Sequence, residues 1–269
     1  IISNLYSMEY EVKNSSFYFN LSNFLNPKFK FNFVLLADNY LQKEEFGKAK
    51  KILKKFNKKD EIYYWYKIRK NTEIINKEGD SNESFKYIKG KYDSISKPSL
   101  KIIYEMGNVC KGFKKYELAI DYYTKVLSKL DPQTIVYSQV LFRRGGSYER
   151  IGEEKKSDED LLKSLEINPD EPHVLNYLAY SWLERNYNIE EAINMLENAY
   201  AQKKNDPYII DSIGWAYYLI GNYIEAEKLL RKAIKLMPSD PIVNDHYGDI
   251  LWRLGRKTQA NYFWKNVLS

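Results

Sequence analysis

The chain repeats itself with a period of 34 to 38 residues, and this period constrains its fold more than any other feature. A small residue opens the pattern in every unit, and a large apolar residue follows it four positions later. The small residues are Ser15, Ala49, Ser84, Ala119, Ser157, Ala192, Ala226 and Ala260. A further position, usually small or apolar, comes seven residues after each of them. Spacings of four and seven place these side chains on one face of an α-helix.

A second set of small residues lies upstream of the first and predicts a second helix in each unit. Its members are Ala37, Gly107, Gly145, Ala179, Gly214 and Gly248. Tight turns such as Gly221-Asn222 and Gly255-Arg256 separate the two helices. Where two helices cross, a glycine, alanine or serine lets the backbones approach closely, and neighbouring large side chains fill the grooves. Each unit is therefore predicted to be a helical hairpin.

The prolines mark the junctions between these units. All eight fall between predicted hairpins, where the missing N–H and the fixed φ of proline are tolerated. Asp206-Pro207 and Asp240-Pro241 read as an N-cap followed by a first-turn proline. We therefore predict an all-α fold.

Residues 208–238 closely resemble the tetratricopeptide repeat, and the units around them match it in phase. The matching positions are Ile213, Gly214, Tyr217, Gly221, Tyr223, Ala226, Leu230, Ala233 and Pro238, then Gly248, Gly255 and Ala260, and earlier Gly107, Tyr116, Ala119 and Tyr123. The last three units also resemble a bacterial subgroup of this family. The resemblance implies a single right-handed α-solenoid over residues 1–269, built from about eight hairpins. Its units are 1–29 (partial), 30–64, 65–99 (degenerate), 100–137, 138–171, 172–206, 207–240 and 241–269 (partial).

Solenoids of this family bind peptides or protein segments in a concave groove that the first helix of each hairpin lines. The resemblance therefore implies a non-catalytic interaction scaffold or adaptor with a protein or peptide partner. The implied groove residues are Phe142, Arg143, Asn176, Tyr177, Tyr180, Tyr208, Asp211, Trp215, Tyr218, Asp245, His246, Asp249, Trp252 and Arg253. Tyr and Trp supply rigid contact area, and Asp and Asn orient a polar partner. The same aromatic residues could instead close the interfaces between stacked helices.

Some members of the family hold a partner's terminal carboxylate with a Lys and an Asn four residues apart. The corresponding positions of this chain hold other residues, so we do not expect this mode of binding. They are Val34/Asp38, Tyr104/Asn108, Phe142/Gly146, Asn176/Tyr180, Asp211/Trp215 and Asp245/Asp249. Asp211, Asp245 and Asp249 instead favour a basic or amide-rich segment.

We expect no catalytic residue, no metal and no cofactor. Cys110 is the single cysteine and is expected to be a buried small side chain, because no adjacent histidine would activate it. His246 with Asp245 and Asp249 would be a sparse ligand set for a metal. The Gly145-Gly146 pair resembles an anion cradle, but helix packing explains Gly145 better.

Charge is divided unevenly along the chain, whose formal net charge is +6. Residues 1–137 hold 25 basic and 16 acidic residues, and residues 138–269 hold 17 and 20. A lysine run contributes to the basic part: Lys48, Lys50, Lys51, Lys54, Lys55, Lys58 and Lys59. It reads as a solvated face, or as a contact with an acidic partner, a membrane surface or RNA. No RNA-recognition signature accompanies it, so a nucleic acid partner is not expected.

Three alternatives stay open. The chain could be the helical arm of a larger enzyme or envelope-assembly protein, an RNA-binding helical-repeat protein, or a subunit that self-associates into a homo-oligomer through its ends. The longest apolar run, residues 215–220, is too short to cross a membrane. The chain begins at Ile1 without an initiator methionine, so we expect a missing N-terminus and assign neither the bacterial cytoplasm nor the periplasm.

Overall fold

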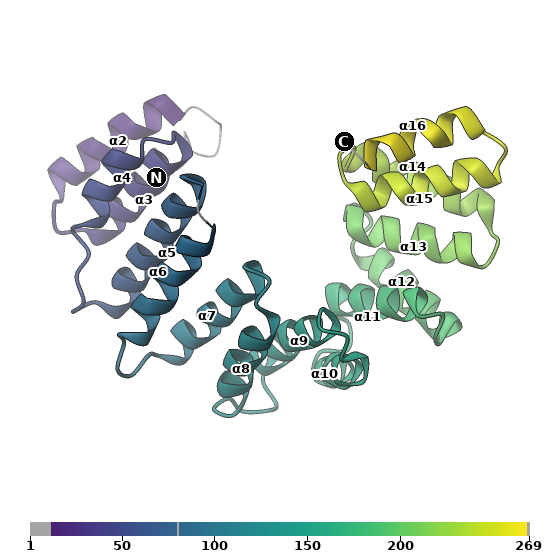
Figure 1. The fold of residues 1–269 in the computed structure, drawn as a ribbon, viewed down its shortest axis with the longest axis horizontal. Helices are drawn as coiled ribbons and strands as arrows, with labels where there is room; N and C mark the ends of the chain where they lie inside the picture. The colour runs from purple at the N-terminus through teal and green to yellow at the C-terminus, as the bar shows by residue number, and fades with distance from the viewer. Residues whose placement is uncertain (1–11, 80, 268–269) are drawn as a thin grey trace. The chain divides into compact units, whose positions relative to one another are not determined.

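The structure, a computed structural model, describes residues 12–79 and 81–267 as helices joined by short turns (Figure 1). Within these residues there are fifteen α-helices and no strand, which confirms the all-α prediction. No helix of the described ranges is both long and apolar enough to cross a membrane. The chain divides into two compact units, residues 1–102 and 103–269, and each is described by itself. The single solenoid over residues 1–269 stays a prediction.

Unit 1 contains two complete hairpins and one preceding helix. The helices are α2 (Val12–Leu25), α3 (Lys30–Gln42), α4 (Phe46–Leu53), α5 (Glu61–Lys77) and α6 (Ser81–Asp93). The first part of the predicted partial unit, residues 1–11, lies outside the described residues, as does the side chain of Ser15. Ala37 and Ala49, the predicted small residues of α3 and α4, are fully buried in one apolar cluster with Leu53.

The degenerate unit keeps the same helix crossing with polar side chains. Ser84 occupies the small position of α6, is fully buried and donates a hydrogen bond to the carbonyl oxygen of Thr72 at 2.8 Å. The hydroxyl of Thr72 in turn donates to the carbonyl oxygen of Ile68 at 2.8 Å. Because both hydroxyl groups have partners, their burial carries no penalty for an unsatisfied donor.

Unit 2 is a stack of hairpins in which successive helices of the unit pack against one another. The helices are α7 (Leu100–Gly112, which begins before the boundary), α8 (Tyr116–Leu127), α9 (Ile135–Glu149), α10 (Glu154–Ile167), α11 (Pro172–Glu184), α12 (Ile189–Gln202), α13 (Pro207–Leu219), α14 (Tyr223–Leu236), α15 (Pro241–Arg253) and α16 (Lys257–Val267). The first helices of successive hairpins also touch, α11 with α13 and α13 with α15. This nearest-neighbour packing is that of an α-solenoid, the predicted fold class.

The helix crossings show why the first helix needs a small residue. A Cβ atom added at Gly214 would lie 2.9 Å from Cγ of Leu230, and one added at Gly107 would lie 2.7 Å from Cε1 of Tyr123. A Cβ atom added at Gly248 would likewise clash with the indole ring of Trp264. Each of these large residues is the one that follows the small residue of the second helix by four positions. The two repeat patterns therefore describe the two sides of one contact.

One residue in the left-handed region ends the first helix of each hairpin. It is Gly221 in the unit with the best match, at φ 80°. The N–H of Asn222 then donates to the carbonyl oxygen of Tyr217 at 2.9 Å, as in a Schellman motif. Equivalent turns use other residue types, among them Lys114 at φ 56°. In the sequence, this turn is recognisable only where glycine marks it.

The junctions before α13 and α15 follow the predicted capping. Pro207 and Pro241 are the first helical residues, and the carboxylates of Asp206 and Asp240 accept hydrogen bonds from the next free backbone N–H groups at 3.0 to 3.3 Å. The two caps fix where these first helices start.

Candidate functional site

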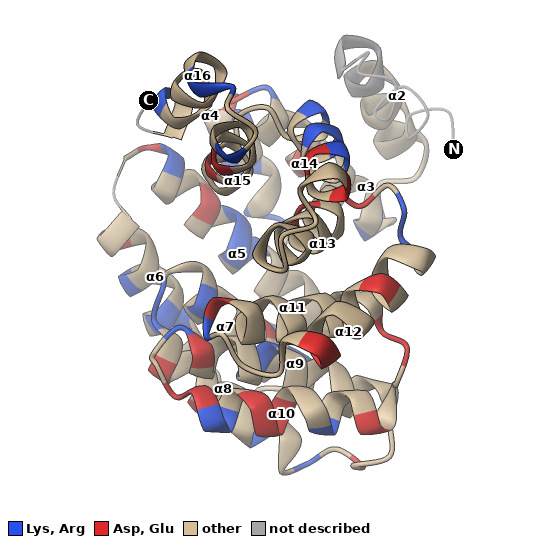
Figure 2. Cartoon of the chain, turned by 90° about the vertical axis from the view of Figure 1, so that its right-hand side faces the viewer, with Lys and Arg blue, Asp and Glu red and all other residues tan. Residues whose placement is uncertain are grey.

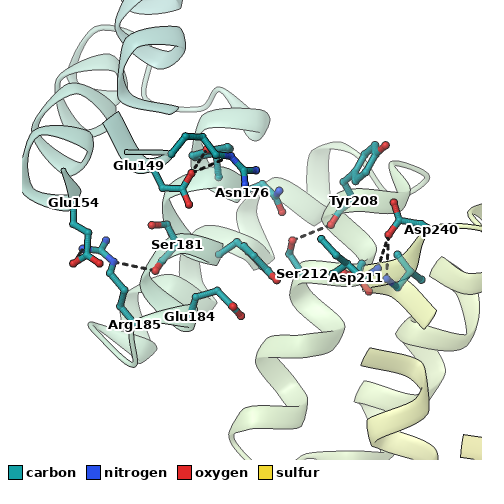
Figure 3. A pocket seen from close by; sticks show the side chains of 15 residues that line it. Glu149, Glu154, Asn176, Ser181, Glu184, Arg185, Tyr208, Asp211, Ser212 and Asp240 are labelled. Carbon is teal, nitrogen blue, oxygen red and sulfur yellow. Dashed lines mark hydrogen bonds and ion pairs between the residues drawn. The ribbon is translucent and has the colours of Figure 1, made fainter. Parts of the chain in front are cut away.

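A cavity of about 530 Å³ opens on the first helices of the last hairpins of unit 2 (Figure 3). Its lining comes from the end of α9, the start of α10, from α11 and α13, and from the start of α15. The lining residues are Glu149, Arg150, Glu154, Asn176, Tyr177, Tyr180, Ser181, Glu184, Arg185, Tyr208, Asp211, Ser212, Asp240, Ile242 and Val243. Figure 3 shows the α9–α11 residues on one side of the cavity and the α13 and α15 residues on the other.

Five of the fourteen predicted groove residues lie together in this cavity. They are Asn176, Tyr177, Tyr180, Tyr208 and Asp211. Asn176 and Tyr180 are four residues apart and share one face of α11, while Asp211 lies on α13. The structure thus brings together side chains from two successive first helices, as the groove prediction requires. That they bind a partner stays a prediction.

A second group of predicted residues forms an aromatic column beside the cavity. The ring of Trp215 stacks on the ring of His246 with centroids 4.1 Å apart and on that of Tyr218 with centroids 4.8 Å apart. Arg253 Nε donates a hydrogen bond to the Tyr218 hydroxyl at 3.2 Å. The indole N–H of Trp215 donates to Glu184 Oε1 at 3.2 Å. These aromatic residues therefore contact one another, and their exposure to a groove stays a prediction.

Asp211 and His246 form a buried pair that joins α13 to α15. Their side chains are 2.9 Å apart, from Oδ2 of Asp211 to Nδ1 of His246, and each residue is 5% exposed. His246 therefore takes its partner from the preceding hairpin and not from Asp245 or Asp249. Within the described ranges, no group of three or more histidine, cysteine or carboxylate ligands converges on a point.

The remaining predicted residues on α15 lie apart from the cavity lining. Asp249 accepts a hydrogen bond from the indole N–H of Trp264 at 3.2 Å, and Trp252 packs against the same indole with ring centroids 5.5 Å apart. Burial, together with the nearby charge of Asp245, raises the pKa of the Asp249 carboxyl. Trp252 remains 44% exposed, which leaves much of its ring free for contact.

Phe142 and Arg143 lie on α9 at the other side of the predicted groove. The ring of Phe142 packs edge-on against Tyr177, with centroids 5.7 Å apart. The hydroxyl of Tyr177 donates to Glu149 Oε2 at 3.0 Å. Burial and the neighbouring Glu149 raise the pKa of the Tyr177 hydroxyl. Phe142 thus supports a tyrosine of the cavity wall, whereas Arg143 is exposed.

Most charged residues of the cavity lining were not predicted from the sequence. Glu184 follows Tyr180 by four residues on α11, and Glu149 is the last residue of α9. The missed set is Glu149, Arg150, Glu154, Ser181, Glu184, Arg185, Asp240 and Val243. The other two lining residues, Ser212 and Ile242, are at positions that the resemblance also implies for the groove. Extending the Asn176–Tyr180 spacing by one more turn would have found Glu184. Burial and the carboxylates of Glu184, Asp211 and Asp245 raise the pKa of the Tyr180 hydroxyl, which reflects the negative charge gathered here.

The lysine run of unit 1 is partly occupied by contacts within that unit. Lys48 pairs with Glu45 at 3.0 Å and Lys50 with Glu78 at 2.9 Å, while Lys55 Nζ lies 4.2 Å from the ring centroid of Phe33. Basic positions outnumber acidic ones on α5 and α6, and acidic positions recur on α10 and α12 (Figure 2).

Comparison with known proteins supports the repeat assignment. Models of the tetratricopeptide repeat match residues 207–240, 100–133 and 138–171. The TPR repeat-containing protein PA4667 of Pseudomonas aeruginosa is 32% identical over 110 residues, which is 41% of this chain and 18% of that protein. The alignment thus covers less than a fifth of the relative. These matches confirm the resemblance found in the residues.

Solved structures share the fold at low sequence identity. The structure of pilF from Pseudomonas aeruginosa superposes with a TM-score of 0.53 at 19% identity, over 63% of this chain and 75% of that one. MamA from Desulfovibrio magneticus RS-1 gives a TM-score of 0.50 at 19% identity, over 63% and 93%. At this level of identity the likeness is one of fold.

Proposed function

We propose, from the premise that this chain is a bacterial tetratricopeptide-repeat protein, that residues 138–269 bind a segment of a protein partner along the first helices of their hairpins. Tetratricopeptide repeats serve as protein-interaction scaffolds, so the role proposed is non-catalytic. In this proposal the partner segment lies over the cavity and along the aromatic column of Trp215, His246 and Tyr218.

The observation that supports this proposal is a preformed cavity. Four successive first helices contribute to its lining, and side-chain hydrogen bonds such as Trp215 to Glu184 hold its walls in place. Binding to side chains that are already ordered costs less conformational entropy than binding to mobile ones. The exposed face of Tyr208 at the rim adds aromatic area of the kind that interfaces use.

The charge of this face favours a protein partner over RNA. The cavity lining holds five carboxylates and two guanidinium groups, which would repel a phosphate backbone. RNA binding through unit 2 would need a basic surface there, whereas residues 138–269 carry more acidic than basic residues.

The proposal is tested with a double substitution, Tyr180→Ala and Trp215→Ala. Pull-down with the wild-type chain and mass spectrometry first identify the partner, and calorimetric titration then gives its affinity. We expect the double variant to lose at least about tenfold in affinity while keeping its helical circular dichroism, because both side chains are only partly buried. Tyr262→Ala, which removes a 63% exposed tyrosine on α16, is the control and should bind as the wild type does. Unchanged affinity in the double variant would place the partner on another face.

A further inference from the structure

Two residues that line the cavity on unit 2 each have a buried hydrogen-bond acceptor that lacks a donor. Oδ1 of Asn176 and Oδ1 of Asp211 are both shielded from solvent, and neither has a hydrogen-bond partner in the described part of the chain. Only 5% of Asp211 is exposed to solvent. Its other carboxylate oxygen, Oδ2, already forms a hydrogen bond with His246. A buried acceptor without a donor destabilises the protein, so native structures rarely keep one without a reason.

The charges around these acceptors are unbalanced. Both guanidinium groups of the lining are engaged: Arg185 pairs with Asp158 at 2.7 Å, and Arg150 lies 3.4 Å from Glu149. Among the described residues, Glu184, Asp211 and Asp240 of the lining form no ion pair with a lysine or arginine. The lining therefore holds three carboxylates that neither of its two arginines pairs with.

The lining also offers aromatic faces and room. Tyr177 and Tyr180 stand on the α11 side, and the volume of about 530 Å³ exceeds what one long side chain needs. A planar cation gains from stacking on such rings in addition to its hydrogen bonds. Guanidinium carries five N–H donors in a fixed fork and can therefore serve several acceptors at once.

We propose that this cavity takes the guanidinium group of an arginine side chain carried by the partner segment, with Asp211, Asn176 and Glu184 as its acceptors. The inference rests on the proposed function and names the chemistry that the partner must present. To reach the cation, the Asp211 and Asn176 side chains turn about χ2, a torsion whose energy profile is broad in both residue types. Asp211 keeps His246 as a partner through its second oxygen.

The probe for this proposal is N-acetylarginine amide, titrated into the full ¹⁵N-labelled chain. The readout is the indole N–H signal of Trp215, which donates to Glu184 at the cavity wall and is assigned with Trp215→Phe. We expect a saturable shift of this signal. N-acetylcitrulline amide, which has nearly the same shape and no charge, should bind about tenfold more weakly because it lacks charge-assisted hydrogen bonds.

Variants place the cation among the named acceptors. Glu184→Gln removes an exposed carboxylate of the wall without disturbing a buried pair, and Asp211→Asn tests the buried acceptor. Each should weaken arginine binding by at least about fivefold, whereas Glu159→Gln, an exposed change on α10 outside the lining, should have no effect. If Asp211→Asn does not fold, Glu184→Gln still decides.

Three results would overturn the inference. The first is that the citrulline probe binds as tightly as the arginine probe. The second is that Glu184→Gln binds the arginine probe as tightly as the wild type does. The third is that no saturable shift is seen at about 10 mM arginine probe, because two charge-assisted hydrogen bonds would already give millimolar binding. Failure of the proposed function would look different. In that case the arginine probe binds, but the partner is still captured by the Tyr180→Ala, Trp215→Ala variant.

Discussion

Single side chains on the groove face are held by residues about one repeat away. His246 contacts Asp211, which lies 35 residues earlier, and the Trp215 indole donates to Glu184, 31 residues earlier. Arg253 reaches Tyr218 over the same 35-residue step. Each contact joins one first helix to the next, so the position of a side chain on this face depends on the neighbouring hairpin as well as on its own.

Burial in unit 2 disfavours the charged form of Lys111. It is partly buried on α7, close to Gly146 of α9. Burial, with the charges of Arg143 and Arg150 as smaller causes, lowers the pKa of its ammonium group to about 8. In the unfolded chain the same group titrates near 10.5. Between these values the unfolded chain binds more protons, so this group's contribution to stability rises as the pH rises from about 8 to 10.5.

Lys111→Met should therefore stabilise the protein at pH 7. We expect a gain of about 1–3 kcal/mol in the free energy of unfolding, which shrinks as the pH approaches about 10 because the wild-type lysine is then neutral. Urea unfolding followed by tryptophan fluorescence measures it, and four of the five tryptophans lie in unit 2. Lys129→Met, at an exposed position, is the control and should show no such pH dependence. A gain that is equal at both pH values would contradict the buried-charge explanation.

At the scale of the helix pair, one backbone conformation recurs whatever residue carries it. The turn after the first helix places a residue at positive φ, and the following N–H closes the helix end with a bond to a carbonyl five residues back. The turn after α11 has a second such residue, Asn188. Glycine adopts this conformation without strain, but Glu44, Lys114 and Asn186 adopt it as well. Non-glycine residues pay about 1–2 kcal/mol for the left-handed region.

Replacing Lys114 by glycine should therefore stabilise unit 2. The free energy of unfolding is expected to rise by about 0.5–1 kcal/mol. Glycine relieves the strain of the left-handed backbone, and the extra conformational entropy that it gives the unfolded chain offsets part of this gain. Lys125→Gly makes the same exchange within α8, where φ is helical, and should cost about 1 kcal/mol. Urea midpoints of the two variants and the wild type give the comparison. A loss of stability in both variants would mean that the side chain of Lys114 matters more than its backbone.

The hairpins could be predicted from sequence because a burial pattern encodes them directly. Ala226, Leu230 and Ala233 must all be buried, and a helix, unlike a strand, presents residues at spacings of four and seven on one face. The turns at Lys114 and Asn186 could not be found, since neither side chain marks a left-handed backbone. Five of the predicted groove residues do line one cavity, but the Asp211–His246 pair could not be foreseen. Helical spacing fixes which face a residue occupies, not which partner it meets on the next hairpin.

At the scale of the molecule, the core of the last three hairpins is continuous. One cluster of buried apolar residues extends from Leu161 on α10 to Ala260 on α16. Unit 1 has a cluster of its own that includes Ala37 and Ile74. Repeat proteins gain stability mainly between nearest neighbours, so damage within one cluster is expected to spread along that cluster.

Ala226→Arg tests how far such damage extends. Ala226 is fully buried in α14, and an arginine there forces both bulk and charge into the core. Hydrogen exchange measured by mass spectrometry should show faster exchange throughout α11–α16, with α3–α6 unchanged as the internal reference. Ile224→Arg, at a position 79% exposed on the same helix, is the control and should exchange as the wild type does. Loss of protection confined to α14 would show that the hairpins open separately.

The contacts that join one hairpin to the next also limit how this surface can diverge. If Asp211 were replaced, His246 would stay buried without the carboxylate that it now contacts. A substitution at one of these positions is therefore tolerated only together with a compensating substitution 35 residues away. Relatives that have acquired a new ligand preference should therefore differ at such positions in matched couples. Residues at the exposed rim, such as Tyr208, have no such tie in the contacts described and are free to vary one at a time.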